Sequence, residues 1–124
     1  MTPEEAVGRV RAYLAAMERR DLAAAGALLA PGFAMTFPTG ARFTALADLV
    51  AWARPRYRFV TKSFERADAA PAPDGIAVTA FGTLAGEWPD GTPFSGVRYC
   101  DWFLVTAAGL ARQEVWNDLA AVAR

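Results

Sequence analysis

The sequence predicts an α+β fold, with three N-terminal helices on one face of a curved antiparallel sheet. The first observation is that capping residues and helically spaced apolar residues gather before residue 55. The second is that the rest of the chain consists of strand-forming runs separated by turns rich in proline and glycine. The 124 residues, of which 54% are hydrophobic and 21% charged, suffice for one compact domain spanning residues 1–124.

Each of the three helices has its own start or stop signal. The first, over 3–17, begins at a capping box formed by Thr2 and Glu5, and its apolar residues recur every three or four positions. The second is expected over 22–29, after an acidic capping residue. The third, over 44–54, is capped by the threonine at its start and ends before a proline, because the residue before proline disfavours helical geometry.

Strands are expected mainly in the second half of the chain. A short alternating run over 33–37 predicts one strand between the second and third helices. Runs rich in strand-forming residues then follow over 57–67, 76–88, 94–105 and 110–119. Their connections contain proline and glycine at turn positions, which favours antiparallel neighbours.

The composition excludes several classes of function. Thirteen basic residues balance thirteen acidic ones, and a protein that holds nucleic acid through its phosphates needs a basic excess. The chain has no histidine, so histidine triads and histidine–metal sites are ruled out. Cys100 is the single cysteine, which excludes an intrachain disulfide. Because glycine-rich phosphate loops and metal-ligand spacings are also absent, we expect no cofactor.

The sequence also predicts where the protein is found. No run reaches the roughly 18 apolar residues of a membrane span. The N-terminus is acidic where a signal peptide carries basic residues. We therefore expect a cytoplasmic protein with no membrane partner.

Four segments together resemble a known family. They are 20–23 (Arg-Asp-Leu-Ala), 28–33 (Leu-Leu-Ala-Pro-Gly-Phe), and the pair 98–105 and 112–118 near the C-terminus. In this order and spacing they resemble the nuclear transport factor 2-like superfamily, within it the polyketide-cyclase-like (SnoaL-like) and ketosteroid-isomerase-like branch. The resemblance implies a cone-shaped fold that encloses a deep apolar pocket, a small apolar organic ligand, and a homodimer. It does not imply one activity, since such folds host enzymes, adaptors and ligand binders.

Side-chain alternation and the resemblance together predict the pocket lining. Every second residue of a strand faces the same side, and the resemblance places the acid-bearing sides of the last two strands toward the pocket. The first helix forms the opposite wall. The predicted lining residues are Tyr13, Met17, Phe37, Trp52, Tyr57, Tyr99, Asp101, Phe103, Glu114, Trp116 and Asp118. For Trp52 and Tyr57 the alternative is plain packing, because aromatic side chains usually bury apolar area.

Tyr13 and Asp101 are the most informative pair. Ketosteroid isomerases hold a phenol and a protonated carboxylic acid where an enolate oxygen develops, and these two residues match them in position. In a pocket with little water, two such donors stabilise charge on oxygen. The alternative is that Tyr13 belongs to the core and that Asp101 is a structural acid. The resemblance fails at Phe37, which stands where those enzymes need a carboxylate base, so we do not expect steroid isomerisation by that mechanism.

Asp118 suggests a second comparison. The limonene-epoxide-hydrolase-like branch uses two aspartates and an arginine, and Asp101 and Asp118 match the aspartates. Tyr99 stands where the arginine is required, so water activation between the two acids is poorly supported. A carboxylate pair still suits acid–base work if its surroundings separate the two pKa values. The alternative is that Asp118 only terminates the last strand.

The sequence therefore predicts a homodimer whose pocket binds a small apolar organic molecule. If the protein is an enzyme, we expect cofactor-free isomerase, cyclase or lyase chemistry through an enolate. Tyr13 and Asp101 would hold the oxygen, and Asp118 or Glu114 would move the proton. The alternatives are a non-catalytic ligand binder and a dimeric interaction module that uses the exposed face of the sheet.

Overall fold

The computed structural model describes residues 1–123 and confirms the α+β class. Three helices lie in the first half, and a six-stranded sheet has the order β2-β1-β6-β5-β4-β3. The helices are α1 (Pro3–Glu18), α2 (Leu22–Gly26), α3 (Leu46–Ala53) and a short C-terminal α4 (Leu119–Val122), with a 3-10 turn at Pro38–Gly40. The strands are β1 (Leu29–Thr36), β2 (Arg42–Phe43), β3 (Phe59–Ala72), β4 (Gly75–Glu87), β5 (Pro93–Thr106) and β6 (Gly109–Asn117).

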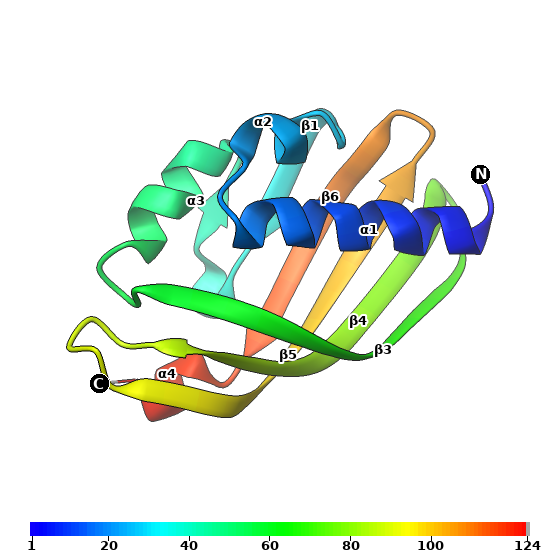
Figure 1. Ribbon diagram of the computed structural model, residues 1–124. Helices are drawn as coiled ribbons and strands as arrows, with labels where there is room; N and C mark the ends of the chain where they lie inside the picture. The colour runs from blue at the N-terminus through cyan, green and yellow to red at the C-terminus, as the bar shows by residue number, and fades with distance from the viewer. Residues whose placement is uncertain (124) are drawn as a thin grey trace.

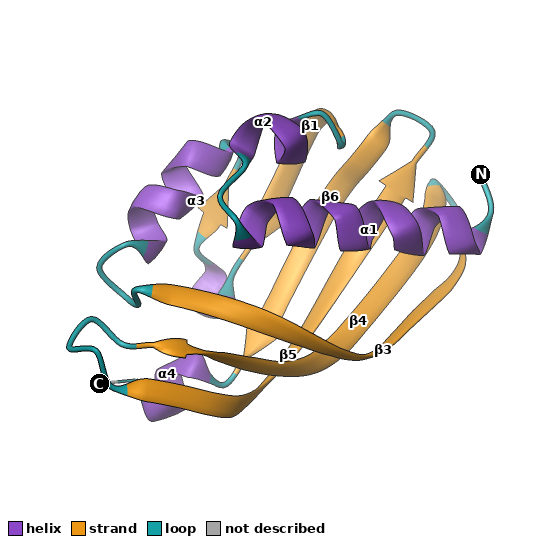
Figure 2. Ribbon diagram, viewed as in Figure 1, coloured by secondary structure: helices purple, strands orange, loops and turns teal. Residues whose placement is uncertain are grey.

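The sheet curves around α1, which crosses its concave face (Figure 1). Helix α2 lies alongside the C-terminal part of α1, α3 lies beyond the C-terminal end of α1, and the short α4 lies beside the start of β5 (Figure 1). Helices α1, α2 and α3 thus gather on one side of the strands (Figure 2). Within residues 1–123, no helix is both long enough and apolar enough to cross a membrane.

Helix α1 forms where the sequence predicts it. The Thr2 side chain accepts a hydrogen bond from the Glu5 backbone, and the Thr2 backbone donates to the Glu5 carboxylate, so the predicted capping box is present. The buried face of the helix packs on the concave side of the sheet and forms the main core. This core includes Ala6, Val10, Tyr13, Leu14, Met17, Met35, Val78, Phe103, Val105 and Leu110.

Two helix boundaries differ from the prediction. Helix α2 ends at Gly26 rather than at Leu29, because Leu29 begins β1 and pairs with Leu110 of β6. The N-cap of α3 is Ala45, whose side chain makes no capping hydrogen bond, so Thr44 is not the cap. In both places tertiary contacts override the local preference.

The sheet also differs from a purely antiparallel one. The β1–β6 pair is parallel, whereas the pairs from β6 through β5 and β4 to β3 are antiparallel. A parallel pair needs a long crossover connection, which here includes α3 and the three long strands that follow it. The parallel pair brings β1, from the first half of the chain, beside the last strand.

Candidate functional site

A cavity of about 500 Å³ lies between the C-terminal half of α1, helix α3 and the concave face of the sheet. Seven of the predicted lining residues border it, namely Tyr13, Met17, Phe37, Trp52, Tyr57, Tyr99 and Asp101. The size suits a small organic molecule, since ligand sites commonly enclose about 300–1,000 Å³. The roles of these residues in binding and catalysis stay predictions.

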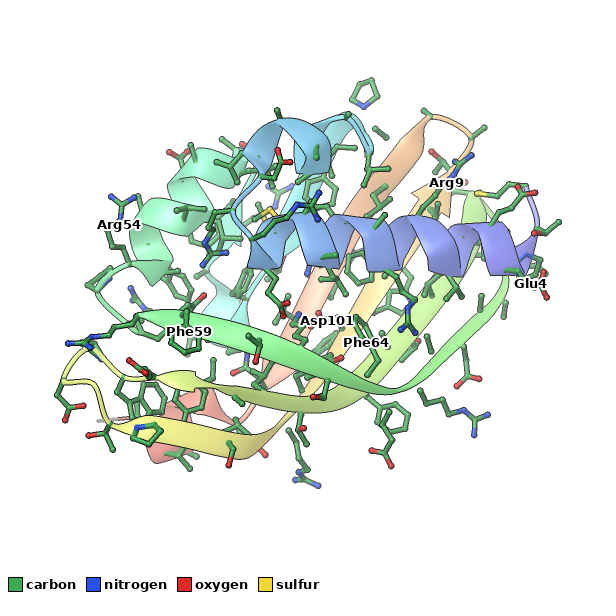
Figure 3. All side chains as sticks on the ribbon, in the orientation of Figure 1. Glu4, Arg9, Arg54, Phe59, Phe64 and Asp101 are labelled. Atoms are coloured by element: carbon green, nitrogen blue, oxygen red, sulfur yellow. The ribbon has the colours of Figure 1, made fainter. Side chains whose placement is uncertain are left out.

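Asp101 is the buried acid of this cavity. It lies on β5 with no solvent exposure, and Figure 3 shows it in view between the ribbons of α1 and β3. Its Oδ2 atom accepts a hydrogen bond from the Lys62 ammonium group. Its Oδ1 atom is buried and has no hydrogen-bond partner in the described residues. A buried oxygen without a partner is energetically costly, so it favours a ligand that donates a hydrogen bond to it.

Lys62 is a site residue that sequence reasoning missed. It lies on β3, lines the cavity, and its side chain is 21% exposed. Its backbone N–H donates to Glu18 at the end of α1 over 2.7 Å, and its ammonium nitrogen lies 4.8 Å from the centre of the Tyr99 ring. One signal was available in the sequence, because Lys62 is the single lysine in a chain with twelve arginines.

The surface of β4 between Lys62 and Asp101 carries small side chains. Lys62 pairs with Leu84 of β4, and Asp101 pairs with Ala80, so Ala80 and Gly82 lie between them. A Cβ atom on Gly82 would lie 1.9 Å from a backbone oxygen of β3. Glycine is therefore required where β3 approaches β4 this closely. With so little side chain in between, the lysine reaches the acid two strands away.

The Lys62 ammonium gives Asp101 a partner that the sequence analysis did not predict. The resemblance implies a neutral carboxylic acid that donates a hydrogen bond. In the structure, Asp101 instead accepts a hydrogen bond from Lys62 through its Oδ2 atom. The role of Asp101 as a neutral donor stays a prediction.

Two phenols stand beside this carboxylate. The Tyr13 hydroxyl donates to the Gln113 side-chain oxygen over 3.1 Å, and the Tyr99 hydroxyl donates to the Ser63 backbone oxygen over 3.4 Å. Burial raises the pKa of both tyrosines, and the negative charge of Asp101 raises each pKa further. Both phenols hence stay protonated, and both protons already have acceptors within the protein. The predicted donation from Tyr13 to a ligand requires its proton to leave Gln113.

The predicted placement of Glu114 and Trp116 of β6, and of Asp118 directly after it, in the pocket was wrong. Glu114 hydrogen-bonds Arg112 over 2.7 Å, and this bond lowers the pKa of Glu114. Trp116 is 57% exposed, and the Asp118 carboxylate pairs with Arg98 on the protein surface over 3.3 Å. None of the three borders the cavity.

A one-residue bulge causes this reversal. Val105 pairs with Leu110, but Leu104 pairs with Arg112, so Ala111 has no partner across the ladder. If the ladder continued regularly from the Val105–Leu110 pair, Glu114 would pair with Asp101 and face the pocket. The extra residue shifts every later pairing by one and exchanges the two faces. The inward residues of β6 are consequently Gln113, Val115 and Asn117, which all line the cavity.

Phe103 was also predicted to line the pocket, and it does not. Its ring is fully buried and meets the Tyr13 ring edge-on, with 6.0 Å between the ring centres. It lies in the main core with residues of α1. Phe103 does lie on the same face of β5 as Asp101, as strand alternation predicts. Helix α1 packs against this part of the face, so Phe103 lies in the core and not at the cavity.

The far wall of the cavity is aromatic. Phe37 and Trp52 lie with ring centres 5.6 Å apart, and the Arg56 guanidinium lies 3.9 Å from the centre of the Trp52 ring. Trp88, which was not predicted as a lining residue, is 3% exposed and stacks on Phe94. These flat surfaces suit a ring-containing ligand, because aromatic side chains bury large areas at low entropic cost. The arrangement thus combines aromatic surfaces with the buried Asp101 carboxylate and the Lys62 ammonium group, and the charged residues Glu18, Arg20 and Arg56 also border the cavity.

A curved sheet wrapped around a long helix, with a cavity at one end, defines the nuclear transport factor 2-like class of α+β proteins. The family model for the SnoaL-like domain matches residues 10–113, and the chain belongs to this family. A comparison with curated proteins gave no match.

Solved structures share the fold over nearly the whole chain. TerC, co-crystallised with polyporic acid, is 16% identical with a TM-score of 0.77 over 94% of this chain and 93% of that chain. An NTF2-like protein from Burkholderia thailandensis E264 is 21% identical with a TM-score of 0.73 over 98% and 95%. A Catenulispora acidiphila protein with a ketosteroid isomerase-like fold, in complex with trimethylamine, is 20% identical with a TM-score of 0.68 over 87% and 83%. At these identities the similarity establishes the fold.

Proposed function

We propose that the chain binds a small, mainly apolar organic molecule in this cavity and moves a proton of that molecule with Asp101. The reaction class would be cofactor-free isomerase, cyclase or lyase chemistry through an enolate. The bound polyporic acid and trimethylamine of two structural neighbours support small organic ligands. The aromatic wall and the cavity volume support the same class.

The observation that carries the proposal is the free oxygen of Asp101. Oδ2 is engaged by Lys62, whereas Oδ1 is buried and has no hydrogen-bond partner among residues 1–123, on a residue that borders the cavity. A carboxylate in this state can accept a proton from a carbon next to a ligand carbonyl. The Lys62 ammonium supplies positive charge near the oxygen on which negative charge develops. The proton acceptor is thus Asp101 itself, in place of Asp118 or Glu114.

Proton abstraction can be tested without knowing the natural substrate. The bicyclic ketone 2-tetralone has acidic protons next to its carbonyl, and NMR in deuterated buffer follows their exchange. We expect the protein to accelerate this exchange, and Asp101→Asn to lower the acceleration by about 100-fold, since a positioned base contributes roughly 10²–10⁴. Asp118→Asn is the matched control and should exchange as the wild type does. Equal rates for the wild type and Asp101→Asn would contradict the proposed role.

A non-catalytic binding protein is the second candidate. The observation in its favour is that the Tyr13 proton is held by Gln113, so Tyr13 does not offer a ligand the free phenol donor that enolate chemistry uses in ketosteroid isomerases. Binding of 2-naphthol, followed by quenching of tryptophan fluorescence, together with no exchange of 2-tetralone would favour this function.

The outer face of the sheet supports the predicted homodimer. Trp116 is 57% exposed and Phe81 36% exposed on this face, so a second copy would bury apolar surface there. Light scattering distinguishes the dimer from a monomer.

A further inference from the structure

Lys62 carries a chemical property that no other residue of the cavity has. The chain uses arginine at twelve of its thirteen basic positions, and the one lysine lies beside the buried acid of the cavity. Arginine cannot give up its proton in a protein, whereas a lysine ammonium can become a neutral amine. A neutral amine attacks the carbonyl carbon of an aldehyde or ketone.

The geometry supplies a route to the neutral amine. The Lys62 ammonium donates to Asp101 Oδ2, so one proton can cross this hydrogen bond and leave an amine and a carboxylic acid. The pair carries no net charge before or after the transfer. A ligand that fills the cavity and displaces water lowers the local dielectric and favours the uncharged pair over the ion pair.

We propose that Lys62 forms a Schiff base with an aldehyde or ketone bound in the cavity, an inference that rests on the proposed binding of a small organic molecule. The amine nitrogen bonds to the carbonyl carbon while the C=O double bond opens. The Asp101 carboxylic acid gives its proton to the departing oxygen, which leaves as water with the second amine hydrogen. The products are a protonated imine, a carboxylate and one water molecule, so atoms and charge balance.

The protonated imine allows Asp101 to take part in a second proton transfer. It takes the place of the ammonium next to the carboxylate, so the local charge pair is restored. The positive imine withdraws electrons from the neighbouring carbon and makes its protons more acidic. The free Oδ1 atom can then accept one of these protons, and an enamine forms. Such amine catalysis goes beyond enolate chemistry, because the ligand is held covalently.

Reductive trapping tests the inference directly. The probe is 2-naphthaldehyde with sodium cyanoborohydride, which converts a protonated imine into a stable secondary amine. The chain has only two primary amines, Lys62 and the α-amine, so peptide mass spectrometry separates them. We expect Lys62 to be labelled at least about tenfold faster than the α-amine, because binding holds the aldehyde beside it. Equal labelling of the two amines would overturn the proposal.

Two variants serve as controls for the chemistry. Lys62→Arg keeps the positive charge beside Asp101 but cannot form an imine, so its label should be confined to the α-amine. Asp101→Asn keeps the lysine but removes the proton acceptor, so labelling of Lys62 should fall at least about tenfold. Circular dichroism establishes that both variants are folded. Undiminished labelling of Lys62 in folded Asp101→Asn would overturn the role of the pair.

The competitor 2-naphthol separates this proposal from the proposed function. It has the same ring system as the probe but no carbonyl, so it should block labelling of Lys62 and leave the α-amine unaffected. If 2-naphthol binds but Lys62 reacts no faster than the α-amine, the Schiff base is refuted and the binding function stands. If 2-naphthol does not bind and Lys62 is unreactive, both proposals fail.

Discussion

Replacing Lys62 by methionine is expected to lower the free energy of unfolding by about 3 kcal/mol, because removing one partner of a buried ion pair typically costs 3–5 kcal/mol. Asp101 is fully buried, and its charge would then have no partner. Methionine replaces most of the apolar stem of lysine, so lost packing contributes little. Urea denaturation followed by tryptophan fluorescence gives the free energy of unfolding by linear extrapolation.

Two further variants decide whether the charge is the cause. Lys62→Arg keeps a cation beside Asp101 and should recover most of the loss. The double variant Lys62→Met with Asp101→Leu removes both charges and should be more stable than Lys62→Met alone, since apolar replacement of a buried pair is often neutral or stabilising. If Lys62→Met lies within about 0.5 kcal/mol of the wild type, the pair does not hold the buried acid.

The expected stability of the double variant bears on function. If the chain folds well without either charge, the fold does not need the pair. A buried carboxylate beside the single lysine, with one oxygen that has no hydrogen-bond partner in the described part of the chain, is then best explained by binding or catalysis. Strained or incompletely satisfied groups tend to persist at functional sites for this reason.

The helical half of the fold could be predicted because its signals are local. The capping box of Thr2 and Glu5 and the apolar spacing of α1 lie within a few residues of one another, and the structure reproduces both. Five of the six strands were also predicted from strand-forming runs and turn residues, whereas the two-residue β2 was not. The parallel pairing of β1 with β6 was not predicted, because it joins segments from opposite ends of the chain.

The candidate site was predicted only in part, for two physical reasons. The ion pair of Lys62 and Asp101 joins residues 39 positions apart on strands that are not neighbours, so no local spacing reveals it. The bulge at Ala111 exchanges the two faces of β6, so the side chains that were predicted to face the pocket face outward. The bulge could be recognised only from the structure, in which the buried Leu110 and Val115 are five residues apart, a spacing that a regular two-residue alternation does not allow on one face.

Replacing Phe103 by alanine is expected to lower the free energy of unfolding by about 4 kcal/mol, since truncating a buried phenylalanine commonly costs 3–5 kcal/mol. The ring is fully buried against Tyr13 and the other core residues of α1, so its removal leaves a cavity that rigid neighbours on the sheet cannot fill. Urea denaturation followed by tryptophan fluorescence measures the decrease in the free energy of unfolding, as for Lys62→Met.

The matched control is Phe59→Ala, which removes the same atoms from an exposed position at the start of β3. Phe59 is 48% exposed, so this variant should lose about 1 kcal/mol or less. The milder Phe103→Leu variant should stay folded and bind 2-naphthol as the wild type does, because the Phe103 ring does not border the cavity. If Phe103→Leu keeps its stability but binds 2-naphthol more weakly than the wild type, Phe103 belongs to the binding site, as the sequence analysis predicted.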